Sequence, residues 1–180
     1  MKVVGFCGPS GVGKTTLIEQ LIAALIAQGQ RVSVIKHAHK RFDIDHPGKD
    51  SWRHRQAGAG EVMIASGQRQ ALLREYPQEG QPSVHALIAQ MADCDWLLVE
   101  GFKHADIAKV EVWRAALGQA PGYPDDPFVV AVACDMPAAL PVATALPVID
   151  MTDTSALASY LMTQAQRFVY RASPTRDHHG

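Results

Sequence analysis

The sequence predicts an α/β fold, in which a mostly parallel sheet is flanked by helices and carries an antiparallel β-hairpin. Three observations support this prediction. Apolar runs typical of buried parallel strands alternate with segments of helical periodicity along the 180-residue chain. A glycine-rich turn joins the first such run to the first helix. Two short segments near the middle of the chain have the pattern of a hairpin.

The first 35 residues have the pattern of a strand, a helix and a second strand. Residues 2–7, KVVGFC, form a short apolar run suited to a buried strand. Residues 15–28 carry apolar side chains at helical spacing, and Gly29 is a natural stop for that helix. Residues 31–35 have the composition of a strand, which completes a βαβ unit.

The turn between this strand and helix carries the most specific pattern in the chain. Residues 8–15, GPSGVGKT, match G-x-x-x-x-G-K-[ST] without departure. Glycines let backbone N–H groups turn inward around phosphate oxygens, where a Cβ would block the approach. Lys14 is placed to reach the β- and γ-phosphates, and Thr15 can offer its hydroxyl to Mg²⁺. The pattern and its context therefore predict a P-loop NTPase fold that binds a nucleoside triphosphate with Mg²⁺.

The middle of the chain predicts a short helix, a hairpin and another short helix. Asp50 follows a Pro-Gly turn signal and is placed to cap a helix that runs to Ala59. Apolar segments flank the sequence SGQR at residues 66–69, so an antiparallel hairpin is expected within residues 61–76. Residues 84–91 have the pattern of a short helix.

Four further strands and a helix are predicted in the second half. An apolar run ends in Glu100, and ligands of open α/β sheets lie beyond the carboxyl ends of strands, so Glu100 should face the phosphate loop. Residues 110–113 alternate like a strand with one exposed face. A buried strand at 128–134, a short strand at 148–149 and a helix at 154–168 follow. These elements predict one domain, residues 1–170, with a polar tail at 171–180 that we expect to be disordered.

Composition limits the classes of partner and the compartment. Seventeen Lys and Arg against eighteen Asp and Glu give a formal net charge of −1, without the basic excess typical of nucleic-acid or anionic-membrane binding. The N-terminus has no signal-peptide pattern, and no apolar stretch reaches the length of a membrane span. Cys7, Cys94 and Cys134 are odd in number and widely spaced, which indicates reduced core residues of a cytoplasmic protein.

Two acids are candidates for Mg²⁺ binding or catalysis at the nucleotide. Glu100 can hold Mg²⁺ through water or orient a water for attack, and its alternative role is to cap a turn. Asp50 or Ser51 can complete the Mg²⁺ shell where many P-loop proteins keep a switch, with Lys49 or Arg53 meeting phosphate. A capped helix with a solvated basic face is an equally good interpretation of that segment.

Two further sets of residues are weaker candidates. Three histidines lie near two aspartates in sequence, but their spacing is not that of a standard zinc site, which favours surface or substrate contacts. They are His37, His39 and His46, near Asp43 and Asp45. The guanine-reading motif Asn-Lys-x-Asp is absent from the sequence. Asp135 is the acid placed where such a reader would lie, although a turn-capping role is favoured.

Several segments together resemble the MobB family, the molybdopterin-guanine dinucleotide biosynthesis adapter proteins. They are residues 8–16, IKH at 35–37, PGKDS at 47–51 with AGA at 57–59, and LVEGFKH at 98–104. The resemblance continues through AVACD at 131–135 toward residue 150. Neither PGKDS nor VEGFK is a general feature of P-loop proteins, so the combination is specific. Residues 118–127 and those after Phe168 match the family least well.

The resemblance implies a cytoplasmic, homodimeric GTP-binding protein with weak GTPase activity. Its implied partner is the guanylyltransferase that joins GMP to molybdopterin, and molybdopterin itself is a further candidate ligand. The residues implied to bind GTP are Ser10, Gly11, Val12, Gly13, Lys14, Thr15 and Thr16. The candidates for catalysis are then Lys14, Glu100 and Asp50, and those for Mg²⁺ are Thr15, Asp50 and Glu100. The hairpins of two subunits are expected to extend the sheet across the dimer.

A small-molecule kinase that uses a nucleoside triphosphate donor is the alternative function. A kinase is expected to close an Arg-rich lid over the phosphates. Residues 118–127 contain no arginine, whereas Arg53, Arg55 and Arg69 keep the alternative open. The leading hypothesis from the sequence is a GTP-binding adapter of molybdenum-cofactor assembly.

Overall fold

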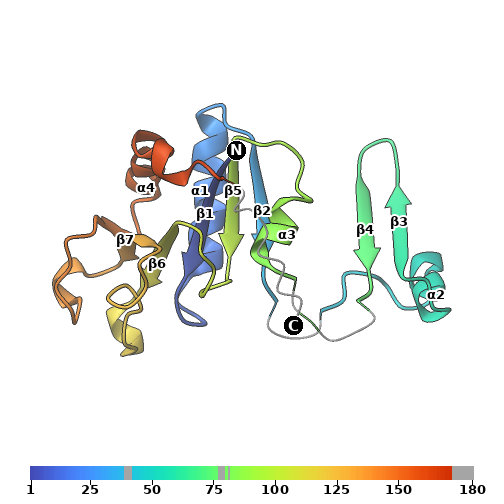
Figure 1. Ribbon diagram of the computed structural model, residues 1–180, viewed down its shortest axis with the longest axis horizontal. Helices are drawn as coiled ribbons and strands as arrows, with labels where there is room; N and C mark the ends of the chain where they lie inside the picture. The colour runs from blue at the N-terminus through green and yellow to red at the C-terminus, as the bar shows by residue number, and fades with distance from the viewer. Residues whose placement is uncertain (39–41, 77–79, 81, 172–180) are drawn as a thin grey trace. The chain divides into compact units, whose positions relative to one another are not determined.

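The computed structural model describes residues 1–38, 42–76, 80 and 82–171 (Figure 1). By its internal contacts the chain divides into two compact units. The first unit runs from Met1 to His37 and resumes at Val84. The second unit spans Ala38–Ser83. The first contains the sheet and the phosphate loop, and the second contains the hairpin.

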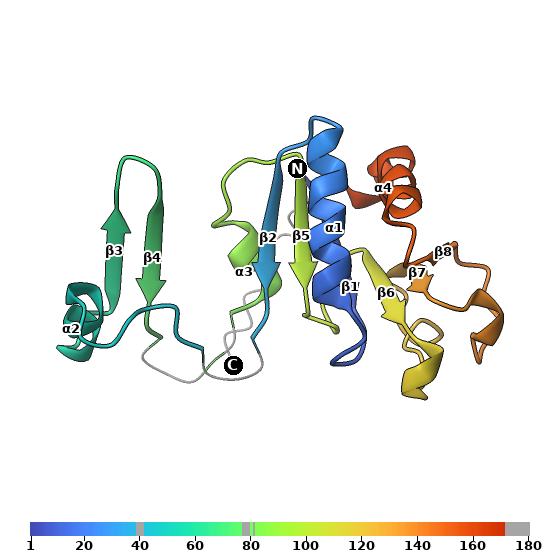
Figure 2. The ribbon, with the colours of Figure 1, turned by 180° about the vertical axis from the view of Figure 1, so that it is seen from behind.

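A six-stranded parallel sheet forms the centre of the first unit. Its strands are β1 Lys2–Cys7, β2 Val32–Lys36, β5 Trp96–Glu100, β6 Lys109–Trp113, β7 Val129–Cys134 and β8 Val148–Asp150. They lie in the order β2-β5-β1-β6-β7-β8, and each adjacent pair is parallel (Figure 2). The predicted parallel sheet is confirmed. Because β5 lies between β1 and β2, Glu100 ends the strand directly beside the phosphate-loop strand.

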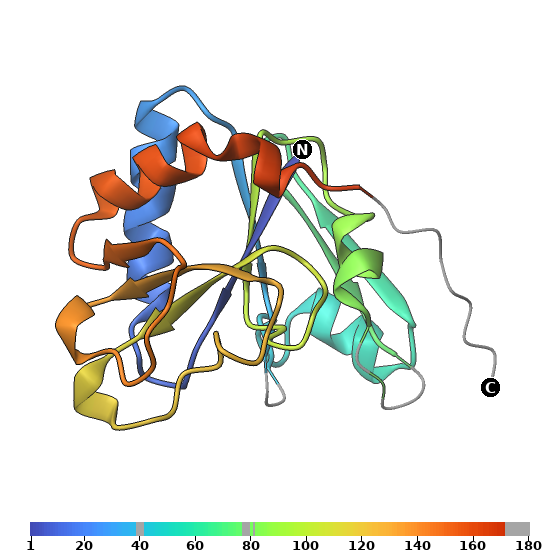
Figure 3. The same ribbon diagram turned by 60° about the vertical axis from the view of Figure 1, so that its left-hand side comes forward.

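Helices cover both faces of this sheet. On one face α1 Lys14–Ala27 and α4 Thr154–Thr163 lie side by side, drawn in blue and orange-red in Figure 3. Leu98 of β5 packs in the same core as these two helices. Its neighbour Leu97 points to the opposite face and packs with the short helix α3 Val84–Ile88. This alternation is the period of two expected of a strand that is buried on both faces.

The C-terminal helix is shorter than the predicted span of 154–168. The helix α4 ends at Thr163, and Ala165–Phe168 form a separate 3₁₀ turn. Asp153 caps α4, since its carboxylate accepts the amide N–H of Ala156 at 2.9 Å. Phe168 is buried against Trp96 with ring centroids 5.7 Å apart, which fixes the 3₁₀ turn to the sheet.

Strand β6 differs most from its prediction. The alternating pattern predicted one exposed face, but all five residues are buried, including Lys109 and Glu111. The Lys109 ammonium donates to the carbonyls of Lys103 and Ala105 at 2.8 Å each and pairs with Asp126 at 2.6 Å. The connections that follow β5 and precede β7 therefore cover this face and supply the polar partners.

Glu111 is the second buried charge on that face. Its carboxylate accepts the backbone N–H groups of Gly122 and Tyr123 at 2.7 and 2.6 Å. Burial raises the pKa of Glu111 above its usual range, and the two amide hydrogen bonds oppose that rise. The loop at 118–127 is thereby fastened to the sheet through backbone groups.

The cysteines have the environment predicted for them. Cys7, Cys94 and Cys134 are buried and carry free thiols. Burial, with the nearby Glu111 charge, raises the pKa of the Cys7 thiol to about 12. Within the described ranges, none of the helices combines the length and apolarity needed to span a bilayer.

The second unit consists of a short helix and a two-stranded antiparallel sheet. Its elements are α2 Asp50–Gln56, β3 Glu61–Ala65 and β4 Gln70–Arg74. The hairpin is confirmed, and the Ser66 amide closes its turn by donating to the Arg69 carbonyl at 2.8 Å. The expected Asp50 cap is wrong: Asp50 is the first residue of the helix, and Lys49 precedes it without a side-chain capping bond. A carboxylate at this position still suits the positive end of the helix.

The hairpin exposes apolar side chains on both faces, since Ile64, on the same face as Val62, is 46% exposed. Val62 and Leu73 are paired in register and half-buried, and β3 contacts α2. On the other face Met63 lies opposite Leu72, with 59% and 43% of their surfaces exposed. An isolated two-stranded sheet is marginally stable in water, so this exposed apolar pair marks a face that benefits from a partner.

Candidate functional site: a phosphate loop with a carboxylate at the neighbouring strand end

The phosphate loop connects the carboxyl end of β1 to the first turn of α1. Gly8, Gly11 and Gly13 have positive φ angles of 132°, 78° and 100°. A Cβ on Gly8 would lie 2.2 Å from the Val112 carbonyl oxygen, a separation that no side chain can occupy. Val12 is fully buried and anchors the loop in the core. Positive φ angles therefore favour glycine at all three positions, and the close approach of β6 requires it at Gly8.

The amino end of α1 is arranged to meet an anion. Gly13 precedes the helix in a left-handed conformation without a side-chain cap, and the first turn has no acidic residue. The free N–H groups and the helix dipole favour negative charge there. Lys14 folds back over the loop, where its ammonium donates to the carbonyls of Gly8 and Pro9 at 2.8 and 2.7 Å. Burial lowers the pKa of Lys14, and the neighbouring Lys36 adds to this effect, whereas Glu100 opposes it.

Glu100 lies within hydrogen-bond distance of the loop's hydroxyl residue. Strands β1 and β5 are in register with Phe6 opposite Glu100, so both strand ends open on the same edge of the sheet. The Thr15 hydroxyl donates to Glu100 Oε1 at 2.8 Å. Two of the residues predicted for a metal site, one from α1 and one from β5, are therefore in contact. A hydroxyl and a carboxylate are hard oxygen donors of the kind that Mg²⁺ prefers, so the pair fits that ion.

Two basic residues at this site were missed by sequence reasoning. Lys36 ends β2 opposite Glu100, and its ammonium lies 3.3 Å from Glu100 Oε2 and 3.4 Å from the Thr15 hydroxyl. Arg114 follows β6 directly, and its Nε donates to the Val12 carbonyl at 2.8 Å. Their shared signal in the sequence is a basic residue at the carboxyl end of a predicted strand, the edge where ligands of parallel sheets lie.

The segment after Glu100 is held close to the same edge. Gly101 has a φ of 95°, and a Cβ there would lie 2.8 Å from the His37 Cβ. The Gly101 amide donates to the Phe6 carbonyl at 3.1 Å, and the His37 amide donates to the Glu100 carbonyl at 2.9 Å. The His37 ring packs against Phe102 with centroids 4.6 Å apart. His37 therefore packs against the residues that follow Glu100.

The switch-like segment lies in the second unit and is organised around an arginine. The Arg55 guanidinium contacts three acids, Asp43 at 3.0 Å, Asp45 at 3.2 Å and Glu75 at 2.7 Å. Ser51 donates its hydroxyl to Asp45 at 2.8 Å. The sequence suggests Ser51 as a Mg²⁺ ligand and Arg55 as part of a kinase lid, but it does not predict this network.

Asp50 itself is solvated at the surface of this unit. Its side chain is 91% exposed and lies 3.9 Å from Arg53. Thr15 and Glu100 both belong to the first unit and are in contact, whereas Asp50 belongs to the second unit. A role for Asp50 at the nucleotide stays a prediction.

His39 and Asp135 are the remaining candidates from the sequence. His39 lies outside the described residues. Among the residues that are described, no group of three or more His, Cys, Asp or Glu side chains is arranged to hold a metal ion. Asp135 Oδ1 accepts the Ala115 amide at 3.4 Å, at the start of the 3₁₀ turn Ala115–Leu117. Asp135 is not the N-cap of that turn, which is Arg114, so its turn-capping role stays a prediction.

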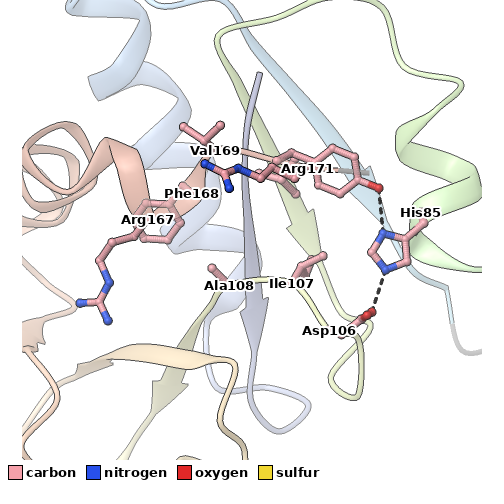
Figure 4. A pocket seen from close by; sticks show the side chains of 10 residues that line it. His85, Asp106, Ile107, Ala108, Arg167, Phe168, Val169 and Arg171 are labelled. Carbon is pink, nitrogen blue, oxygen red and sulfur yellow. Dashed lines mark hydrogen bonds and ion pairs between the residues drawn. The ribbon is translucent and has the colours of Figure 1, made fainter. Parts of the chain in front are cut away.

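A small pocket of about 200 Å³ lies beside the amino-terminal half of β1, with Val3 in its lining (Figure 4). His85 stands between two partners there: its Nδ1 lies 2.8 Å from the Tyr170 hydroxyl, and its Nε2 lies 2.7 Å from Asp106. The hydrogen bond from His85 lowers the pKa of Asp106. This trio joins α3, the β5–β6 connection and the segment after the last 3₁₀ turn, and the carboxyl edge of the sheet is not involved.

Comparisons with known proteins agree on one family. The family model described as MobB, molybdopterin guanine dinucleotide synthesis protein B, matches residues 3–135. A protein of Escherichia coli strain K12, named molybdopterin-guanine dinucleotide biosynthesis adapter protein, is 42% identical over 168 residues, which is 92% of this chain and 94% of that protein. A Haemophilus influenzae protein with the same name is 43% identical over 138 residues, 75% of each chain.

Solved structures give the same result for the fold. The crystal structure of a MobB protein homologue from Bacillus stearothermophilus superimposes with a TM-score of 0.68 at 26% identity, covering 92% of this chain and 99% of that one. Bacillus subtilis MobB has a TM-score of 0.70 at 23% identity, with 91% and 98% coverage, which supports the fold alone.

Proposed function

The chain belongs to the MobB family, and on that premise we propose that it is an adapter in the formation of molybdopterin guanine dinucleotide that binds GTP with Mg²⁺. The observation that carries this proposal is the 2.8 Å hydrogen bond between Thr15 and Glu100. It joins a complete phosphate loop to an acid on the neighbouring strand, the arrangement that a nucleoside triphosphate with its metal ion requires.

Each part of the loop has a role in this proposal. Backbone N–H groups of residues 10–13 and the first turn of α1, including Thr16, surround the phosphates. Lys14 exchanges its contacts with the Gly8 and Pro9 carbonyls for phosphate oxygens, which form stronger, charge-assisted hydrogen bonds with its ammonium. Thr15 and Glu100 would hold Mg²⁺, which would neutralise phosphate charge.

The same contacts favour slow hydrolysis. Glu100 Oε1 accepts from Thr15 and Oε2 pairs with Lys36, so the carboxylate is directed toward a cation. A general base must instead lie within hydrogen-bond distance of the attacking water. We therefore propose weak GTPase activity in service of the adapter role. The guanine dinucleotide in the names of the relatives supports a preference for guanine.

The partner assignments rest on the family and on the hairpin. We propose that the chain acts in the cytoplasm on a guanylyltransferase that joins GMP to molybdopterin, with molybdopterin as a further candidate ligand. We also propose a homodimer formed through the hairpin. In that arrangement the hairpins of the two subunits extend the sheet. The exposed pair Met63 and Leu72 supports it, because a two-stranded sheet alone is marginally stable in water.

Co-purification and a coupled assay test the adapter role. The tagged chain is incubated with a guanylyltransferase of this pathway, with GTP or GDP, and guanylyl transfer to molybdopterin is followed. We expect the enzyme to be retained and transfer to be stimulated. The Lys14→Ala variant should lose the GTP-dependent part of this effect, whereas Lys2→Ala, the same change at the amino end of β1, should keep it.

Two outcomes would contradict the proposal. A guanylyltransferase that is neither retained nor stimulated under either nucleotide would contradict the adapter role. Turnover with a small phosphate acceptor faster than about 1 s⁻¹, the low end for kinases, would instead favour the kinase alternative.

A further inference from the structure

Three side chains from three elements meet at the carboxyl edge of the sheet. Thr15 is the second residue of α1, Lys36 the last of β2 and Glu100 the last of β5. The register pairs Lys36 with Glu100 across adjacent parallel strands. The Lys36 ammonium lies 3.3 Å from one Glu100 oxygen and 3.4 Å from the Thr15 hydroxyl, while the other Glu100 oxygen accepts from Thr15.

We propose that Lys36 is an internal counter-ion that occupies the cation position between Thr15 and Glu100 and that Mg²⁺ displaces when the nucleotide is loaded. This inference rests on the proposed function and deepens it, because it makes Lys36 the residue that sets how strongly nucleotide binding depends on the metal. Lys36 is a positioning residue in this account, acting through Glu100.

The geometry explains why the two cations exclude each other. The ammonium sits beside both oxygen atoms at hydrogen-bonding range, whereas Mg²⁺ needs oxygen ligands at about 2.0–2.1 Å in near-octahedral order. Mg²⁺ so close to the ammonium would also meet the repulsion of like charges. One of the two cations must therefore leave the oxygen pair.

Lys36 is built to be the one that moves. Its side chain is 57% exposed, whereas that of Glu100 is 12% exposed. A lysine has a flexible four-carbon stem and a compact charge, so it can turn toward solvent or toward a phosphate without moving the strand. Glu100 is held by the Thr15 hydrogen bond and ends an interior strand that is paired on both sides, so it stays in place.

The electrostatic consequence has a definite sign. In the absence of Mg²⁺, Lys36 neutralises Glu100 and reduces the repulsion between that carboxylate and the nucleotide phosphates. Removing the ammonium therefore weakens metal-free nucleotide binding and eases metal entry. By linkage, the factor by which Mg²⁺ strengthens nucleotide binding equals the factor by which nucleotide strengthens Mg²⁺ binding, and this factor should rise.

The test measures the dissociation constant of a non-hydrolysable GTP analogue by calorimetry, with EDTA and with saturating Mg²⁺. The metal coupling is the dissociation constant measured with EDTA divided by the one measured with Mg²⁺. Lys36→Met should raise this ratio by about two- to fivefold over the wild type, the range set by an exposed ion pair. Lys36→Gln, which keeps a donor but no charge, should behave like Lys36→Met. Lys2→Met, the same charge change at the other end of the sheet, should leave the ratio unchanged.

The contradicting results separate the inference from its premise. Nucleotide binding with an unchanged or lower coupling ratio in both Lys36 variants overturns the counter-ion role and leaves the proposed function intact. A wild type that binds no nucleotide under either condition overturns the proposed function, and the counter-ion role with it. Thermal melts of the variants establish that each one is folded.

Discussion

At the scale of single residues, the site depends on where a side chain is forbidden as much as on where one is present. Gly8 lies against the Val112 carbonyl with a φ of 132°, and Gly101 lies against His37 with a φ of 95°. The Gly8 carbonyl accepts a hydrogen bond from Lys14, and Gly101 directly follows Glu100. Small residues here bring backbones together, and the charged groups are placed as a result.

Gly8→Ala tests this view. The new Cβ would meet the Val112 carbonyl oxygen at 2.2 Å, so we expect urea unfolding to show a loss of at least about 2 kcal/mol. Gly29→Ala is the matched control, because Gly29 has a φ of 75° with no atom within 4 Å of the added Cβ. The control should lose only about 1 kcal/mol, the cost of the left-handed conformation. Equal losses would show that the close approach to β6 is unimportant.

At the scale of elements, β6 has a polar pattern but a buried position. Lys109 and Glu111 lie on the face covered by the neighbouring connections, which provide a carboxylate, two carbonyls and two amides. Gly5 makes room for the Lys109 stem, since a Cβ on Gly5 would lie 2.7 Å from the Lys109 Cγ. Buried polar groups are tolerated when each has a partner, and here they hold two loops in place.

Lys109→Met should therefore destabilise the protein although it is more apolar. It leaves Asp126 and the carbonyls of Lys103 and Ala105 without their donor, and we expect a loss of about 3 kcal/mol in urea unfolding. The double variant with Asp126→Asn should recover part of this loss, because the unpaired charge is removed. If the Lys109→Met protein were as stable as the wild type, the hydrogen bonds and ion pair of the ammonium would not contribute to stability.

The Arg55 network predicts a pH response in the second unit. For Asp43, the Asp45 amide and then the Arg55 guanidinium lower the pKa. For Asp45, burial raises the pKa, but hydrogen bonds from Ser51, His46 and Arg55 outweigh it and the pKa is lowered. Because both folded pKa values lie below the unfolded ones, the carboxylates stabilise the unit above about pH 4 and cease to do so as pH falls through the lowered values.

Hydrogen exchange across residues 43–56 measures this response. In the wild type, protection corrected for intrinsic rates should fall as the pH drops below about 4. In Arg55→Met, protection should already be low at neutral pH and change less with acid. Undiminished protection in Arg55→Met at neutral pH would contradict the network's role.

At the scale of the whole molecule, the sequence predicts most of the fold but only part of the site. The alternation of apolar runs and helical segments predicts the parallel sheet, and the SGQR turn predicts the hairpin. The P-loop pattern and an acid at a strand end predict Lys14, Thr15 and Glu100. Lys36 and Arg114 depend on strand order, which places β5 between β1 and β2 and lets β6 approach the loop. Local periodicity does not encode that order.

The hairpin carries a prediction about assembly. If the face with Met63 and Leu72 joins two copies, Met63→Lys should shift sedimentation toward a monomer by placing a charge in an apolar contact. Gln68→Lys adds the same charge at the turn and should leave the dimer intact. A Met63→Lys protein that sediments like the wild type would place the contact elsewhere.

The central claim is that GTP with Mg²⁺ binds at the phosphate loop, and a competition titration tests it most directly. GTP and ATP are titrated separately into the full chain with Mg²⁺, for the wild type, Lys14→Ala and Lys2→Ala. The account predicts saturable binding that is tighter for GTP, lost in Lys14→Ala and kept in Lys2→Ala. Equal or tighter binding of ATP would contradict the guanine preference, and full GTP affinity in Lys14→Ala would contradict the phosphate-loop site.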